Sequence, residues 1–256
     1  MTDLRDVLKS MRGAPPRTGG GGGPQGPRAA FWKKPKPGQP AQTTAFRLYR
    51  FDHMGKKIVC SQRTVHNTGF AGRPEWVPCA GEGCTICTTW QELRRMAFLD
   101  DLNKKAALDK ADQVRPQTKF EFVGINQSNP VEFTLIELPE GAAKKVLLAA
   151  AKEAGWIGGY PEQPGKEATE EELQAAEAKL IELDEKTAQG LDVLCGPAGR
   201  DVAITVNPLC AVKSDWYTVD VVRGVPRTLT QLEDGAVPNP YETRERMEAA
   251  RARKGQ

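Results

Sequence analysis

The sequence of 256 residues has little of several features that would assign a function directly. It has only two histidines, which limits the catalytic sites it can build, and its longest apolar run, residues 146–151, is far too short to cross a membrane. Residues 1–12 lack the apolar stretch of a secretory signal, so we expect an intracellular protein. In a reducing compartment, the six cysteines are expected to be thiols or metal ligands rather than disulfides.

Signatures of common enzyme classes are also missing. The Walker loop of nucleotide hydrolases, the H-E-x-x-H helix of zinc proteases and the G-x-S-x-G turn of serine hydrolases do not occur. His66 is followed by Asn67 and Thr68, so the H-x-E signature of zinc deaminases is absent too. We therefore predict that the protein is not an enzyme.

The net charge of +3 is small, but the charges are distributed unevenly along the chain. Residues 1–50 hold ten lysines and arginines against two acids, whereas residues 161–192 hold ten acids against three lysines. Such a division into a basic and an acidic region indicates a polyanionic partner. The alternative is a solvated basic tail together with the solvated face of an acidic helix.

Composition and periodicity divide the chain into three regions. Residues 1–44 are predicted to be a flexible basic arm rich in glycine and proline, with a short amphipathic helix near its start. The apolar stripe of that helix consists of Leu4, Val7, Leu8 and Met11. Residues 45–227 are predicted to form the folded core, with a cysteine-rich subdomain at 60–112, and residues 228–256 a charged, partly helical tail.

The core has the pattern of a mixed domain. Apolar alternation predicts strands at residues 45–51, 57–65, 119–124, 131–138, 201–206 and 216–222. Helical spacing predicts helices at 88–112 and 141–154, and the capping box Thr169-x-x-Glu172 begins a third. We expect an α+β, mainly β fold, such as an OB-fold-like five-stranded barrel with a zinc-binding insertion and added helices. The pattern does not separate this barrel from other small α+β folds.

The most specific motif is a cluster of metal-binding residue types. Its spacing is H-x12-C-x4-C-x2-C, formed by His66, Cys79, Cys84 and Cys87. A Cys-x-x-Cys pair directs two thiolates at one ion, and a further cysteine and a histidine complete a tetrahedron. Gly81 and Gly83 supply the backbone freedom for a tight turn. Four protein ligands leave no open position, so we predict one structural Zn²⁺.

Other interpretations of these residue types remain open. Cys60 could replace His66 as the fourth ligand, and a site made only of thiolates could hold iron or an iron–sulfur cluster. A redox pair formed by Cys84 and Cys87 is disfavoured, because the surrounding sequence lacks the βαβ pattern of thioredoxins. The remaining residues of these types are expected to be ordinary thiols or surface-loop residues: Cys195, Cys210 and His53.

Strand 45–51 combines arginine with aromatic residues. Arg47, Tyr49 and Phe51 share one face, which suits the stacking of bases and the pairing of phosphates. Tyr49 and Phe51 could equally be core residues of a second sheet face. The candidates for stacking are Trp32, Tyr49, Phe51 and Trp76, and those for phosphates are Lys33, Lys34, Lys36, Arg47, Arg50, Lys57 and Arg63. Phe120, Phe122, Phe133 and Trp216 are better suited to the core.

The order of these features resembles a known family. A basic, glycine-rich arm is followed by Phe31-Trp32-Lys33-Lys34-Pro35, strand 45–51, the cluster that ends Cys84-Thr85-Ile86-Cys87, and a helix. This order is similar to that of the single-stranded DNA-binding proteins of tailed phages, of the T-even helix-destabilising type. The segments Gly199–Ile204 and Tyr217–Val219, followed by Pro226, are similar to the closing strands of that group.

The resemblance implies a function and its partners. It implies an OB-fold with a zinc subdomain that coats and protects single-stranded DNA cooperatively, without sequence specificity, during phage DNA replication, recombination and repair. The apolar stripe of the arm would dock on a neighbouring protomer, and the protein would act in the host bacterial cytoplasm, beside replication or recombination proteins and away from membranes.

One feature departs from the family. Members often end in an acidic tail that recruits partners, whereas residues 231–256 balance five acids with five bases. The acidic segment of this chain is internal, at residues 162–192. The alternative function is a zinc-stabilised protein-interaction module of a phage replication or transcription assembly.

Overall fold

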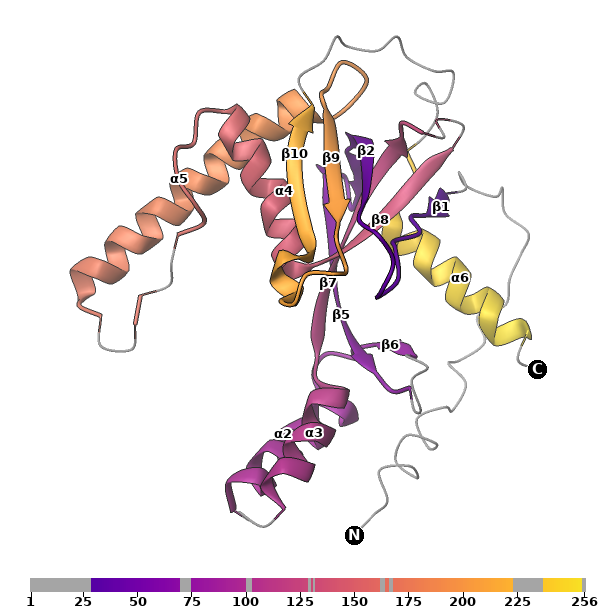
Figure 1. The fold of residues 1–256 in the computed structure, drawn as a ribbon, viewed down its shortest axis with the longest axis vertical. Coiled ribbons are helices and arrows are strands. Elements are labelled where there is room, and N and C mark those ends of the chain that lie inside the picture. Colours follow the sequence, from indigo (N-terminus) through magenta and orange to yellow (C-terminus); the bar gives the residue numbers. More distant parts are fainter. Residues whose placement is uncertain are drawn as a thin grey trace. The chain divides into compact units, whose positions relative to one another are not determined.

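The structure, a computed structural model, describes residues 29–69, 75–99, 103–128, 130, 132–161, 164–165, 168–222 and 237–254 (Figure 1). The fold is α+β, with 40% helix and 31% strand. The chain divides into two compact units, the first built around Gln62–Lys119 and the second around Gln25–Ser61 and Phe120–Arg246. The predicted stripe of Leu4, Val7, Leu8 and Met11 lies outside the described residues.

The first unit contains a β-hairpin and two helices. β5 (Cys60–Asn67) pairs antiparallel with β6 (Trp76–Pro78), and α2 (Thr85–Leu99) is followed by α3 (Lys104–Val114). The single helix predicted at 88–112 is thus two helices. Two shorter helices can fold against each other and bury Leu93 and Ala111 in one core, which a single straight helix cannot do.

The second unit contains a mixed sheet. Its strands follow the order β1 (Ala29–Phe31), β8 (Phe133–Pro139), β7 (Gln117–Asn126), β2 (Gln42–Tyr49), β9 (Asp201–Val206) and β10 (Tyr217–Val222). β1 and β8 run parallel, whereas β2 is antiparallel to both of its neighbours and β9 is antiparallel to β10. A short 3₁₀ helix, Lys213–Trp216, leads into β10.

A separate hairpin consists of β3 (Phe51–His53) and β4 (Lys56–Ile58). Met54 and Gly55 form its turn with φ values of 49° and 75°, the left-handed conformation that tight hairpin turns require. His53, predicted to be a surface-loop residue, lies in β3 and stacks on Tyr241 with 4.2 Å between ring centroids.

The α+β class is confirmed, but the chain is not mainly β, because its helix content exceeds its strand content. The strand path of the second unit is open and ends at β1 and β10, so the described strands do not form the predicted five-stranded barrel. An open sheet can bury both faces if other elements cover them, and alternating apolar residues do not distinguish that arrangement from a closed barrel.

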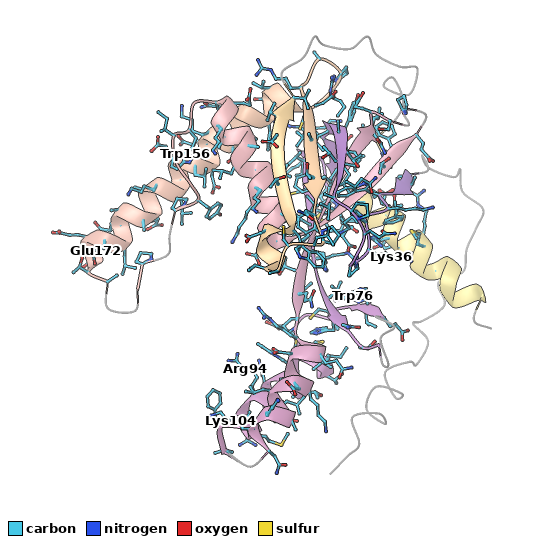
Figure 2. The ribbon with its side chains drawn as sticks, viewed as in Figure 1. Lys36, Trp76, Arg94, Lys104, Trp156 and Glu172 are labelled. Atoms are coloured by element: carbon cyan, nitrogen blue, oxygen red, sulfur yellow. The ribbon has the colours of Figure 1, made fainter. Side chains whose placement is uncertain are left out.

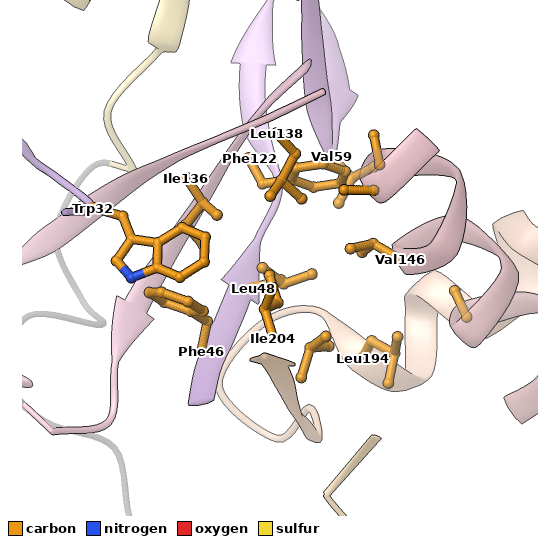
Figure 3. Packing of buried hydrophobic residues seen from close by; sticks show 14 of the residues in the cluster. Trp32, Phe46, Leu48, Val59, Phe122, Ile136, Leu138, Val146, Leu194 and Ile204 are labelled. Atoms are coloured by element: carbon orange, nitrogen blue, oxygen red, sulfur yellow. The ribbon is translucent and has the colours of Figure 1, made fainter. Parts of the chain in front are cut away.

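Helices cover one face of this sheet. α4 (Glu140–Glu153) and the C-terminal part of α5 (Glu170–Leu194) contribute Val146, Leu191 and Leu194 to a core with Phe46 and other strand residues (Figure 3). The two helices approach closely at Gly190. A Cβ atom placed there would lie 1.7 Å from the carbonyl oxygen of Ala150, so only glycine fits.

The opposite face carries a second core, formed by β2, β7, β8 and the hairpin. Tyr49, Phe51 and Phe133 are buried in it, and Tyr241 of α6 (Pro240–Lys254) packs against it. Arg244 of the same helix binds the carboxylates of two neighbouring strands, Glu121 on β7 and Glu137 on β8. The start of α6, up to Arg246, is therefore part of the folded second unit, rather than only a charged tail.

Several local predictions are confirmed. Thr169 caps α5, with Glu172 completing the capping box, and α4 ends next to Gly155, whose φ is 87°. Phe122 and Phe133 are buried. α5 continues to Leu194, beyond its predicted end near residue 188, because Leu191 and Leu194 pack on the sheet. No helix among the described residues is long and apolar enough to cross a membrane.

Candidate metal centre

Three elements of the first unit, the strands β5 and β6 and the helix α2, bring the four predicted ligands together. His66 lies on β5, and Cys79 directly follows β6, where its backbone N–H donates a hydrogen bond to the carbonyl of Thr64 at 2.9 Å. Cys84 directly precedes α2, and Cys87 lies in its first turn. The cluster therefore connects the hairpin to the start of the helix.

The loop between these elements makes the turn predicted for it. Gly81 and Gly83 both have φ of 77°, in the left-handed region that other residues avoid. The N–H of Cys84 donates to the carbonyl of Gly81 at 3.1 Å and closes the turn. Both glycines are therefore needed for geometry, as the sequence indicated.

The spacing of the ligand atoms fits one tetrahedral ion. The four atoms lie within 4.8 Å of one another. The Sγ atoms of Cys79 and Cys87 are 3.6 Å apart, and Nε2 of His66 is 3.6 Å from Sγ of Cys84 and 3.5 Å from Sγ of Cys87. Tetrahedral zinc, with its usual bond lengths, has edges of about 3.8 Å between sulfurs and about 3.6 Å between sulfur and nitrogen.

A hydrogen bond orients the imidazole of His66, which is fully buried. Its Nδ1 lies 3.0 Å from the carbonyl oxygen of Val114, at the end of α3. A carbonyl only accepts, so Nδ1 carries the proton and Nε2 presents its lone pair to the three sulfurs. Such a partner on the second ring nitrogen is typical of metal-binding histidines.

Hydrogen bonds and burial shift the pKa values of two of the thiols, Cys84 and Cys87, in opposite directions. Burial opposes ionisation of Cys84, but backbone N–H groups of Cys87, Ala80 and Ile86, with the Cys79 thiol, outweigh it and lower the Cys84 pKa to about 6. Burial, followed by the neighbouring thiols Cys79 and Cys84, raises the pKa of Cys87 to about 12. One negative charge therefore forms readily in the cluster and opposes a second, which a divalent cation would neutralise.

Cys60 is not part of this cluster. Its side chain packs against the apolar core of the second unit, where burial raises its pKa to about 11. Between the two ligand sets that the sequence left open, the structure favours His66. Three thiolates and one imidazole form a closed donor set that suits a structural ion.

Three of the predicted stacking residues are core residues. Trp32 packs edge-on against Phe46 with 5.1 Å between ring centroids, and Tyr49 packs in the same way against Phe133 at 5.4 Å. Phe51 has no exposed surface. Base stacking by these rings is not supported, because burial leaves them no open face. For Tyr49 and Phe51 the structure favours the alternative, core packing.

Arg47 has a structural partner as well. Its Nε donates to the carboxylate of Asp201 at 2.7 Å, and its Nη1 donates to the carbonyl of Pro197. The Arg47 side chain is only 4% exposed. Its charge is therefore satisfied inside the second unit, which argues against a phosphate contact.

The predicted cations differ in accessibility. Lys33 and Lys36 are exposed, whereas Lys34 is half-buried and donates to the carbonyl of Glu137 at 2.7 Å. Lys57 and Arg50 form exposed ion pairs with Asp52 and Asp192, respectively. Arg63 is half-buried on β5. The exposed ion pairs of Lys57 and Arg50 add little stability, so a phosphate could readily replace either carboxylate.

Trp76 is exposed to solvent, as its predicted role in base stacking requires. Its indole projects from β6 (Figure 2). The residue is 39% exposed. The ammonium of Lys119 lies 4.6 Å from the ring centroid. Trp76 is three residues before the ligand Cys79, so a bound ion would hold its strand in place. The first unit thus presents an aromatic face beside a cation.

Sequence reasoning did not identify Lys119, Trp90 or Arg94. Lys119 lies on β7, far from Trp76 in the sequence, so no local signal could reveal its contact. Trp90 and Arg94 lie four residues apart on α2, and the guanidinium of Arg94 is 5.4 Å from the indole centroid. That spacing on a helix could have indicated the contact.

The sequence was compared with models of protein families and with curated proteins, and neither comparison gives a match.

Proposed function

We propose that the protein binds single-stranded DNA without sequence specificity, as the family resemblance implies, and that one zinc ion organises its first unit. The observation that carries the proposal is the exposed indole of Trp76, paired with Lys119 on a strand that leads directly to a metal ligand. A ring face beside a cation is the unit from which sequence-independent strand binding is built.

The proposed contacts fall into two chemical kinds. Trp76 stacks on a base, since every base has a π-face, and such a contact contributes about 1–3 kcal/mol. Lys33, Lys36 and Lys57 are exposed and pair with phosphates. Phosphate contacts release condensed counterions, so the affinity is expected to fall steeply with salt.

Zinc is the metal proposed for the cluster of His66 and three cysteines. Thiolate and imidazole ligands at tetrahedral spacing are typical of structural zinc. When bound, the ion supplies a closed, redox-inert cross-link. His66, Cys79, Cys84 and Cys87 would hold it, and the hairpin that carries Trp76 would be fixed to α2.

The acidic segment is proposed to compete with DNA at one point. Asp192, near the end of α5, pairs with Arg50 at 2.6 Å, and both side chains are more than a third exposed. A phosphate can replace this carboxylate at little cost. We expect Asp192→Asn to tighten oligonucleotide binding a few-fold, whereas the exposed Asp184→Asn on the same helix serves as the control.

The wider biological role extends the resemblance. We propose cooperative coating of single strands in phage DNA replication, recombination and repair inside the host cell, with the stripe of residues 4–11 contacting a neighbouring protomer. Since the C-terminal residues are not acidic overall, recruitment of replication proteins is assigned to the internal acidic helix α5.

The test is a titration of the zinc-loaded protein with oligo(dT), followed by fluorescence anisotropy of a dye on the DNA. We expect binding that weakens with salt, is weaker for duplex, and falls about tenfold in Trp76→Leu, in line with the loss of one stacked base. Trp156→Leu, which removes a tryptophan from the second unit, should bind like the wild type. Absence of binding at low salt would disprove the proposal.

A second candidate function is favoured by a different observation. Exposed apolar side chains lie on and beside acidic α5: Ile157 is 95% exposed, Leu173 51% and Ile181 55%. This is the surface expected of a zinc-stabilised protein-interaction module. A chain that binds no nucleic acid at low salt, and whose binding to a purified replication protein is lost in Leu173→Glu and Ile181→Glu, would support this function instead.

A further inference from the structure

The first unit contains a cavity that the proposed function does not use. It has a volume of about 520 Å³ and lies between α2, α3 and the residues that follow α3. Trp90 and Arg94 line it from α2, Leu108 and Asp112 from α3, and Arg115 and Pro116 from the segment before β7. Its volume lies within the range of small-molecule sites.

The walls of this cavity combine three kinds of recognition chemistry. The half-buried indole of Trp90, with Leu108 and Pro116, offers flat apolar contacts. The guanidiniums of Arg94 and Arg115 are permanently charged and bind phosphate oxygens in a fork geometry. Asp112 is a carboxylate that accepts hydrogen bonds from N–H groups. A nucleotide carries the complement of all three.

Both guanidiniums are available to a ligand. Among the described residues, no carboxylate lies within ion-pair distance of Arg94 or Arg115. Arg94 instead lies over the indole of Trp90 at 5.4 Å. A phosphate bound to this guanidinium would lie above the indole face, so the site offers positive charge and an aromatic surface together, as in sites where bases stack beside arginine.

The metal cluster holds both walls of the cavity. Trp90 lies three residues after the ligand Cys87 on α2. The ligand His66 binds the carbonyl of Val114, the residue before Arg115. Cys84, Leu93 and Ala111 pack in one core beneath them. The cavity is therefore preformed when the metal is bound, which lowers the cost of ordering its side chains on binding.

We infer that this cavity binds one nucleotide, with the base stacked on Trp90, the phosphate on Arg94 and Arg115, and a base N–H group on Asp112. The ligand is either a free mononucleotide or one nucleotide of a bound single strand. The inference does not depend on the Trp76 surface, so the two sites can fail separately.

The test uses the zinc-loaded full-length protein, with GMP, guanosine and inorganic phosphate as probes in isothermal titration calorimetry. We expect saturable binding of GMP, much weaker binding of guanosine or phosphate alone, and a loss of about five- to a hundredfold in Trp90→Leu. Trp90→Phe should retain most of the affinity. Arg94→Gln with Arg115→Gln should lower it about tenfold or more, whereas Arg95→Gln, outside the cavity, should not change it.

The source of the nucleotide is decided by competition. If oligo(dT) displaces GMP and Trp90→Leu also weakens oligo(dT), the cavity holds one nucleotide of the strand. If GMP binds beside a saturating oligonucleotide, the ligand is a free nucleotide. Zinc content and far-UV circular dichroism identify variants that have lost the fold. Absence of saturable GMP binding to the folded wild type, or equal binding to Trp90→Leu, would overturn the inference.

Discussion

Arg244 provides the sharpest test of how the second unit is held together. It lies on α6, and its guanidinium binds Glu121, which is 1% exposed, and Glu137, which is 28% exposed. The same guanidinium lies 4.2 Å from the ring centroid of Phe31. Arg244→Met keeps much of the volume and removes the charge, which leaves the Glu121 carboxylate buried without its cation.

The expected cost follows from these burials. Removing one partner of a buried ion pair typically destabilises a protein by about 3–5 kcal/mol, because the remaining charge stays buried after its counter-ion is lost. Glu137 can be hydrated and adds little, and the lost contact with Phe31 adds about 0.5–1 kcal/mol. We therefore expect Arg244→Met to lower the free energy of unfolding by about 3.5–6 kcal/mol, a large part of the stability of a typical domain.

The assay is urea unfolding of the zinc-loaded protein, followed by far-UV circular dichroism. Arg246→Met is the matched control, since it removes an exposed pair with Glu242 on the same helix and should cost less than about 0.5 kcal/mol. Arg244→Met combined with Glu121→Leu should recover most of the loss, because no buried charge remains. Equal unfolding midpoints for Arg244→Met and Arg246→Met would refute the reasoning.

Three further predictions concern other parts of the molecule. Chelation, or Cys84→Ser, should unfold the first unit and abolish a metal content of one ion per chain, measured by atomic absorption and circular dichroism. Gly190→Ala should lower the free energy of unfolding by about 1–3 kcal/mol or more, because the new Cβ meets the carbonyl of Ala150. Burial raises the pKa values of Cys60 and Cys195 to about 11 and about 12, so both thiols stay protonated in the fold while the unfolded chain ionises near pH 9. Stability should therefore fall as the pH rises from about 9 to 12, and less steeply when both are replaced by valine; a slope identical to the wild type would contradict the assignment.

The residues of the candidate metal site were predictable because their chemistry is local in the sequence. The spacing from Cys79 to Cys87 places three thiols in one turn and the start of a helix, and the two glycines indicate that turn. The capping box at Thr169 is local in the same way. The sequence could not show which atom holds His66 in place, since its hydrogen-bond partner is the carbonyl of Val114, 48 residues away.

The roles of the aromatic residues were not predictable, because they depend on contacts with residues far away in the sequence. Alternation in strand 45–51 shows two faces but not what covers each. The second face is covered by the hairpin of β3 and β4 and by residues near Tyr241, almost 200 residues further along the chain. Arg47 finds its carboxylate at Asp201, 154 residues away. Only tertiary structure could separate core packing from base stacking at these positions.

The parallel pairing of β1 with β8 has a mechanical consequence. Any tension applied through the residues before Ala29 enters the sheet along β1. Backbone hydrogen bonds between the two strands share that load in shear instead of breaking one after another. Behind them, the N–H of Trp32 donates to the carbonyl of Leu135 at 3.0 Å, and its ring is anchored edge-on against Phe46. A force on the basic arm would therefore be distributed over the β1–β8 hydrogen bonds and the Trp32 contacts, which connect the arm to the hydrophobic core of the second unit.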